Sequence, residues 1–182
     1  SLMWIEPGKP VSLADLERGV VISSGNDASV AVAEHLAGTE SSFVDVMNQL
    51  AEELGLENTV YRNPHGLPHP EHRSTSRDLA TLSVALINGH PEHYKIYKEQ
   101  SFTYNGIKQY NRNSLLRSDA TVDGLKTGYT SEAGYGLVAS AQREDMRLVS
   151  VVLGSASKRT RAFENSSLLT VSYTHLTLPT MS

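Results

Sequence analysis

The chain has 182 residues, of which 39% are hydrophobic and 20% are charged, with a net charge of −4 and no cysteine. This composition indicates a folded domain with a buried core, and it excludes a disordered chain, disulfide bonds and cysteine-ligated metal sites. The lysines and arginines are scattered and are outnumbered by acidic residues, so we expect no nucleic-acid partner.

The first half of the chain has the pattern of several helices. Ser12 suits an N-cap, with an acidic residue three positions later. From Asp27 to Leu36 small and apolar residues cover most of a helix surface, which predicts a buried helix. An amphipathic helix is expected from Ser41 or Ser42 until Gly55 closes it, and another follows Ser76 as its cap.

An irregular loop rich in proline is predicted at residues 63–70, between the third and fourth helices. His65, His69 and His72 have a spacing that suggests zinc. Prolines interrupt this segment, however, so the three histidines do not share a helix face. We therefore expect no metal site here.

The second half of the chain has the pattern of an antiparallel sheet. Asn105-Gly106 separates two short β-like runs, and this pair is a strong hairpin signal because both residues tolerate positive φ. A second hairpin is predicted from the strand-like runs 135–141 and 147–153, and a helix at 158–169 can close the domain. Helices followed by antiparallel strands predict an α+β fold.

The end of the chain does not fit this domain, which we expect to comprise residues 1–169. The final stretch, 170–182, is rich in threonine and serine, and its leucines and proline follow no helical period. We interpret it as a foreign or unstructured segment and exclude it from functional reasoning.

Lys126-Thr127-Gly128 has the residue types needed to grip the C-terminal carboxylate of a peptide. We expect these residues on an edge strand, whose alternation places Lys126 and Gly128 on one face. Lys126 supplies positive charge, and Gly128 lets a ligand backbone lie close. Thr127 supplies a hydroxyl but needs a local twist to reach that face, and the amide of Tyr129 is a candidate oxyanion donor. Taken alone, the triplet is better explained as an ordinary strand end.

Ser24-Gly25-Asn26 stands where the buried helix begins. By itself this triplet is best explained as a helix cap. In a functional interpretation, Ser24 relays protons and Asn26 binds a substrate amide or a catalytic lysine. Asp27 can cap the helix alone, which favours function because Ser24-Gly25-Asn26 would then have no structural task. Arg112 is a candidate second cation for a carboxylate, since arginine binds it with two bonds.

The two triplets are two of the three motifs of active-serine enzymes. They occur with further motifs in the order Ser23-Ser24-Gly25-Asn26-Asp27-Ala28, Asn63-Pro64-His65-Gly66-Leu67, Tyr104-Asn105-Gly106-Ile107, Asn111-Arg112-Asn113 and Val122-Asp123-Gly124-Leu125-Lys126-Thr127-Gly128. With these motifs, residues 1–169 resemble the low-molecular-mass penicillin-binding proteins, the serine-type D-alanyl-D-alanine carboxypeptidases of bacteria. The resemblance implies the β-lactamase/DD-peptidase fold, an antiparallel sheet flanked by helices with a helical subdomain, incomplete here at the N-terminus.

The same resemblance implies an enzyme that removes the terminal D-alanine from peptidoglycan pentapeptide stems through an acyl-serine intermediate, and that penicillins acylate. Ser24 would carry protons toward the leaving group, and Lys126 with Arg112 would bind the carboxylate. No metal or organic cofactor is implied. The expected partners are peptidoglycan stem peptides and β-lactam antibiotics, and the expected location is periplasmic or otherwise extracytoplasmic.

One family motif is missing. Ser-x-x-Lys carries the nucleophile and should precede the other two motifs, but no serine ahead of Ser24 has a lysine three residues later. We therefore expect a truncated fragment that is inactive and poorly soluble alone. The membrane-anchoring C-terminal region of the family is not seen either, so membrane contact is expected only through regions outside this sequence.

Two alternatives remain open. A class A β-lactamase shares the lysine triplet but usually has Ser-Asp-Asn, where this chain has Gly25, and the loop near Glu71 lacks the expected Glu-x-x-x-Asn pattern. The other alternative is a non-catalytic peptidoglycan-binding module that keeps the carboxylate grip without the chemistry.

Overall fold

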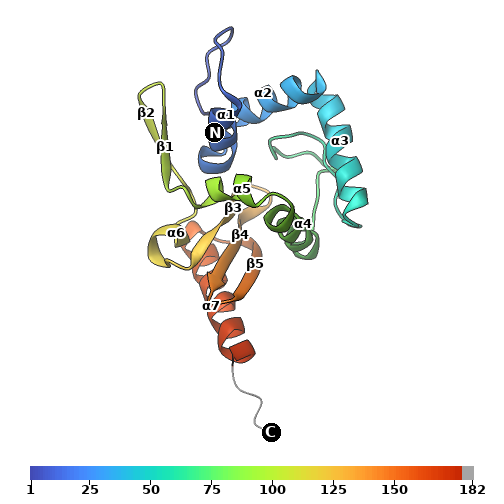
Figure 1. The fold of residues 1–182 in the computed structure, drawn as a ribbon. Coiled ribbons are helices and arrows are strands. Elements are labelled where there is room, and N and C mark those ends of the chain that lie inside the picture. Colours follow the sequence, from blue (N-terminus) through green and yellow to red (C-terminus); the bar gives the residue numbers. More distant parts are fainter. Residues whose placement is uncertain (178–182) are drawn as a thin grey trace. The chain divides into compact units, whose positions relative to one another are not determined.

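The computed structural model describes residues 1–177, which form two compact units. The first unit comprises Ser1–Arg112, and the second begins at Asn113. The predicted α+β class is confirmed, because helices dominate the first unit whereas an antiparallel sheet with a covering helix forms most of the second (Figure 1). Across the described residues, no helix combines the length and the apolar character needed to cross a membrane.

The helices of the first unit follow the predicted order. They are α1 (Leu13–Ser23), α2 (Asn26–Ala37), α3 (Glu40–Glu53), α4 (Ser76–Gly89) and the short α5 (Pro91–Tyr94), which leads into the 3₁₀ helix η1 (Lys95–Lys98). Ser12 caps α1 as expected and accepts a hydrogen bond from the Asp15 amide at 3.1 Å. The N-caps of α3 and α4 are Thr39 and Thr75, not the predicted serines, so α3 begins slightly earlier than predicted.

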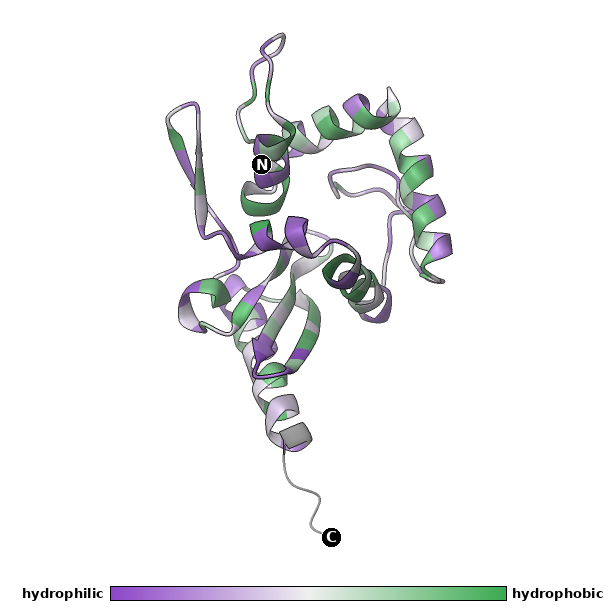
Figure 2. Ribbon diagram, viewed as in Figure 1, coloured by the Kyte–Doolittle hydropathy of each residue, from purple (hydrophilic) through white to green (hydrophobic). Residues whose placement is uncertain are grey.

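A hairpin completes the first unit. Its strands β1 (Ser101–Tyr104) and β2 (Ile107–Tyr110) pair antiparallel, as predicted. Both turn residues have positive φ, 47° at Asn105 and 74° at Gly106, which explains the Asn-Gly sequence. The hairpin belongs to the core of this unit, which gathers Met3, Leu16, Val21, Ile22, Ala28 and Phe102. Figure 2 shows that the helices around it alternate hydrophobic and hydrophilic residues, as amphipathic helices do.

The second unit is a three-stranded antiparallel sheet covered by a long helix. After the short helix α6 (Leu115–Ser118) come β3 (Val122–Thr130), β4 (Gly134–Arg143), β5 (Met146–Ser155) and α7 (Lys158–Thr177), and the strand order is β3-β4-β5. The predicted hairpin of β4 and β5 is confirmed. Helix α7 packs on β4 and β5 (Figure 1). The core between them contains Val122, Leu137, Ala139, Ala141, Leu169 and Tyr173.

Helix α7 extends beyond its predicted end at Leu169 and continues to Thr177. Tyr173 explains the extension, because its ring is buried and its hydroxyl donates to the carbonyl of Ala141 at 2.5 Å. The prediction of an unstructured segment is therefore wrong for residues 170–177, although the foreign origin of this segment stays a prediction. Residues 178–182 of that segment lie outside the described residues.

A buried asparagine anchors α7 to the sheet. The side chain of Asn165 has no exposed surface, accepts a hydrogen bond from the Ser150 hydroxyl at 2.6 Å and donates to the Leu137 carbonyl at 3.2 Å. A buried amide is costly unless it is hydrogen-bonded. The position of α7 along the strands is therefore fixed by polar contacts as well as by apolar packing.

Candidate active site

Ser24 and Gly25 form the turn between α1 and α2, and Asn26 is the first residue of α2. Ser24 ends α1 in the left-handed conformation, with φ 55° and ψ 44°, and Gly25 is the N-cap of α2. The amide of Gly25 donates to the carbonyl of Gly19 at 2.9 Å. The expectation that these residues have no structural task is therefore wrong, since they end one helix and begin the next.

The backbone of Ser24 is strained. A residue with a side chain pays an energetic penalty in the left-handed region, which glycine avoids. Ser24 is half-buried, whereas the neighbouring Gly25 is buried. Backbone preference therefore does not explain why a serine occupies this position.

Asp27 does not cap α2 as predicted, because Gly25 occupies the N-cap position. Its carboxylate instead accepts backbone hydrogen bonds from Met3 and Trp4, each at 2.8 Å, and from Ile5 at 3.2 Å. The first residues of the chain are thereby fastened beside the Ser24-Gly25-Asn26 turn.

Gly25 has no room for a side chain. A Cβ atom there would lie 3.1 Å from the Met3 amide nitrogen and 3.0 Å from a carboxylate oxygen of Asp27. We expect Gly25→Ala to destabilise the folded state by about 1–3 kcal/mol through overpacking. Gly89→Ala is the matched control, because nothing lies within 4 Å of its Cβ position and alanine is favoured in a helix. Thermal unfolding of the two variants tests this, and equal melting midpoints would contradict it.

The lysine triplet lies on β3, an edge strand of the sheet, as predicted. Lys126 pairs with Val138, and Thr127 pairs with Leu137. Directly paired residues share a face of the sheet, and Leu137 faces α7. Thr127 is therefore on the α7 face, whereas Lys126 and Gly128 are on the opposite face.

Space and charge on β3 agree with the expected carboxylate grip. No atom lies within 4 Å of the position that a Cβ of Gly128 would occupy, so the strand is open there to close approach. The ammonium of Lys126 donates to the carbonyl of Thr127 at 3.1 Å. Tyr129 is exposed and stacks on Tyr135, with ring centroids 4.2 Å apart.

Arg161 is a residue of this region that the sequence analysis missed. It is buried on α7 and donates from Nη1 to the carbonyls of Gly128, at 2.9 Å, and Gly136, at 3.1 Å. Its guanidinium also lies over the ring of Tyr135. The signal available in the sequence was the four-residue spacing from Arg161 to Asn165, Leu169 and Tyr173, which places all four on one helix face.

Arg112 is exposed between two buried asparagines. Asn111 donates to the carbonyl of Glu99 at 3.0 Å within the first unit. Asn113 donates to the carbonyl of Gly124 at 2.9 Å and accepts from the Leu115 amide at 3.1 Å within the second. The asparagines of Asn111-Arg112-Asn113 thus anchor the backbone, and the arginine between them is presented to solvent.

The predicted site residues fall into two groups. Ser24, Asn26 and Arg112 belong to the first unit, whereas Lys126 and the residues after it belong to the second. That both groups serve a single pocket stays a prediction.

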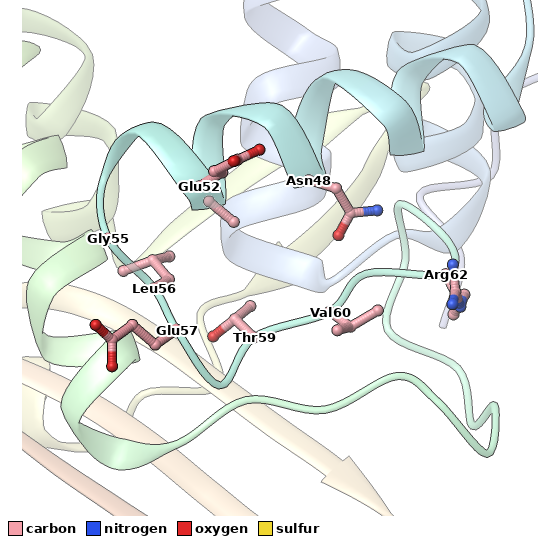
Figure 3. A pocket seen from close by; sticks show the side chains of 9 residues that line it. Asn48, Glu52, Gly55, Leu56, Glu57, Thr59, Val60 and Arg62 are labelled. Carbon is pink, nitrogen blue, oxygen red and sulfur yellow. The ribbon is translucent and has the colours of Figure 1, made fainter.

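A pocket of about 500 Å³ in the first unit contains none of the motif residues. It lies between α3 and the segment that follows it, and its labelled side chains include Asn48, Glu52 and Arg62 (Figure 3). The amide of Asn48 is already engaged, since it accepts from the Tyr61 amide at 2.8 Å and donates to the Tyr61 carbonyl at 3.0 Å. None of the residues predicted for the active site lines this pocket.

The three histidines of the proline-rich region each contact other protein groups, and for His72 the partner is the Arg62 amide, which donates to its Nδ1 at 3.4 Å. The Nδ1 atoms of His65 and His69 each accept a hydrogen bond from the amide two residues later, at 3.2 Å. Burial lowers the pKa of His72, and the neighbouring His65 and His69 lower it further. Among the described residues, no three His, Cys, Asp or Glu side chains are grouped as metal ligands.

Comparisons with known proteins agree with this geometry. Residues 1–157 match the family model described as D-alanyl-D-alanine carboxypeptidase. The chain is 53% identical over 171 residues to D-alanyl-D-alanine carboxypeptidase DacC of Escherichia coli K12, which covers 93% of this chain and 43% of that protein. It is 49% identical over 171 residues to D-alanyl-D-alanine carboxypeptidase DacA of Haemophilus influenzae, and this alignment covers 93% of this chain and 44% of that protein. The chain thus spans less than half the length of these curated relatives.

Solved structures give the same result. Penicillin binding protein 5 from Haemophilus influenzae has a TM-score of 0.94 and 48% identity, covering 96% of this chain and 51% of that chain. A mutant of the Streptomyces K15 DD-transpeptidase has a TM-score of 0.90 and 26% identity, covering 96% of this chain and 73% of that chain. These neighbours confirm the predicted β-lactamase/DD-peptidase-like fold.

Proposed function

Because the chain belongs to the D-alanyl-D-alanine carboxypeptidase family, we propose that it is part of a serine enzyme that removes the terminal D-alanine from peptidoglycan pentapeptide stems. The family match over residues 1–157 is the observation that carries this proposal. The substrate lies outside the cytoplasm, so we place the enzyme in the periplasm or an equivalent extracytoplasmic compartment. β-Lactam antibiotics would acylate the same serine.

In the proposed reaction a serine hydroxyl attacks the carbonyl carbon of the penultimate D-alanine. The peptide bond breaks, the terminal D-alanine leaves with a proton on its amine, and water then hydrolyses the acyl-serine ester. Ser24 delivers the proton to the leaving amine, and Asn26 holds a substrate amide or the catalytic lysine. The strained backbone of Ser24 supports this role, because glycine would fit that turn with less strain.

The lysine triplet recognises the end of the peptide. Lys126 neutralises the terminal carboxylate and supports proton transfer, with Arg112 as a second cation. Thr127 contributes its hydroxyl, although the register on β3 turns it toward α7. The open strand at Gly128 accepts the substrate backbone, and the amide of Tyr129 donates to the oxyanion.

The nucleophile is not supplied by the sequence described here. The single Ser-x-x-Lys spacing in the chain is Ser155-Ala156-Ser157-Lys158, downstream of both triplets. Ser155 is buried, and its hydroxyl donates to a carboxylate oxygen of Glu164 at 2.5 Å. Because this hydroxyl is buried and already hydrogen-bonded, we assign the nucleophile to sequence upstream of Ser1.

Expression of the gene at full length tests the proposal. We expect a Ser-x-x-Lys motif upstream of Ser1, stable covalent labelling by a fluorescent penicillin, and release of D-alanine from a pentapeptide. Rapid hydrolysis of the penicillin without a stable label would indicate a β-lactamase instead. Retention on peptidoglycan with neither labelling nor release would indicate a binding module.

A further inference from the structure

Strand β3 contains one extra residue just ahead of the lysine triplet. Val122 pairs with Ala141 on β4, and Gly124 pairs with the next residue, Ser140, so the register of the ladder passes over Asp123. This is a β-bulge, a feature that changes the direction in which the following side chains point. The bulge lies three residues before Lys126.

The bulge decides which face of the sheet carries Lys126. Val122 packs with Leu137 and Ala139 on the face that α7 covers. Since side chains alternate along a strand, an unbulged β3 would place Lys126 on that same buried face. The extra residue reverses the alternation, and Lys126 instead pairs with Val138 on the opposite face.

An arginine from β5 holds the extra residue in place. The two terminal nitrogens of Arg147 donate to the two carboxylate oxygens of Asp123, at 2.8 and 2.7 Å. Nη1 also donates to the hydroxyl of Ser140 at 2.7 Å, and Ser140 has no exposed surface. Because β4 separates β5 from β3, the guanidinium spans the central strand and links all three strands at the bulge. We call this pair the Asp123–Arg147 clamp.

The clamp acts on the same face as Lys126. Arg147 pairs with Gln142 on β4, and Gln142 alternates with Ser140 and Val138 on one face of that strand. The fork of arginine matches a carboxylate with two bonds, which lysine cannot reproduce. A further restraint comes from Asn113, which donates to the carbonyl of Gly124 at 2.9 Å.

We propose that Asp123 and Arg147 are positioning residues, which keep Lys126 on its functional face by fixing the bulge in β3. This inference rests on the proposed function, because the position of Lys126 matters only if Lys126 binds the substrate. It assigns the clamp no contact with that substrate.

The test uses the full-length protein and measures both the rate constant and the final extent of labelling by a fluorescent penicillin. We expect Arg147→Met and Asp123→Asn to slow acylation by about 100-fold, the scale for a reacting group displaced by about 1 Å, while labelling still reaches completion. A residue that only stabilised the fold would lower the labelled fraction and leave the rate constant of the folded protein unchanged. Arg147→Lys should be intermediate.

The chain offers a matched control in a second arginine–aspartate pair on the same sheet. Arg143 on β4 and Asp119, just ahead of β3, lie 3.2 Å apart, with side chains 31% and 27% exposed against 29% and 18% for the clamp. We expect Arg143→Met to lower the melting midpoint to a similar degree as Arg147→Met but to leave the acylation rate constant unchanged.

Each outcome is decisive. The double variant Asp123→Asn with Arg147→Met should be no slower than the slower single variant, because both changes release the same bulge. Wild-type rate constants in the clamp variants, or equal slowing by Arg143→Met, would overturn the positioning role while leaving the proposed function intact. A wild-type protein that does not label would overturn the proposed function, and the positioning role with it.

Discussion

Replacing Lys126 with alanine in the full-length protein is expected to slow labelling by a fluorescent penicillin roughly 100- to 1000-fold. The register on β3 turns this side chain away from the α7 face, and the strand is open at Gly128 beside it. A cation directed at a carboxylate contributes a charge-assisted bond that a neutral side chain cannot replace. Loss of one such preorganised group costs roughly 100- to 1000-fold in rate.

Lys108→Ala is the control for that experiment. Lys108 is an exposed lysine on β2, and its ammonium lies over the ring of Tyr110. We expect this variant to label at the wild-type rate and to keep its free energy of unfolding within roughly 0.5 kcal/mol of the wild-type value, as is typical of surface substitutions. Labelling of Lys126→Ala at the wild-type rate would remove this lysine from the mechanism.

Replacing Ser24 with glycine is expected to stabilise the fold and to impair the enzyme. Glycine relieves the left-handed strain at φ 55°, which amounts to about 1 kcal/mol. Removing the hydroxyl should lower the rate of acylation by roughly 100- to 10,000-fold, as for loss of a general acid–base group. Thermal unfolding and the kinetics of penicillin labelling measure the two effects separately.

Ser24→Ala separates the backbone from the hydroxyl. Alanine keeps the strain and removes the hydroxyl, so we expect the same kinetic loss without the gain in stability. If Ser24→Gly labelled as fast as the wild type, the turn alone would matter and the proton-relay role would be wrong. Equal melting midpoints for the two variants would show that the left-handed backbone at position 24 is not strained by a side chain.

Local signals in the sequence predicted most of the fold. Asn105-Gly106 fixed one hairpin because its turn needs two residues that tolerate positive φ. The end of α7 was predicted wrongly, since threonine and serine are poor helix formers whereas the burial of Tyr173 outweighs that preference. Propensity is a local quantity, and this helix is stabilised by contacts with β4 and β5.

The sequence predicted the residue types of the candidate site but not the long-range contacts that hold those residues in place. Alternation correctly placed Lys126 and Gly128 on one face, but which face depends on the bulge at Asp123, whose partner Arg147 is 24 positions away in the chain. The role of Asp27 was missed for the same reason, because its acceptor contact with Met3 also spans 24 positions. A motif shows which residues recur, whereas long-range hydrogen bonds decide how they are held.

The buried amide of Asn165 has a consequence for the neighbourhood of the lysine triplet. Apolar contacts have no direction, so by themselves they would not distinguish the observed position of α7 from one shifted by a helical turn, about 5.4 Å. Such a shift would break the hydrogen bonds of Asn165 to Ser150 and to the Leu137 carbonyl. These bonds therefore select one position of α7 along the sheet. Arg161 lies one turn earlier on the same helix, and in this position of α7 it donates a hydrogen bond to the Gly128 carbonyl. A single buried amide in the core of the second unit thus fixes the alignment of a helix that supports the strand carrying the lysine triplet.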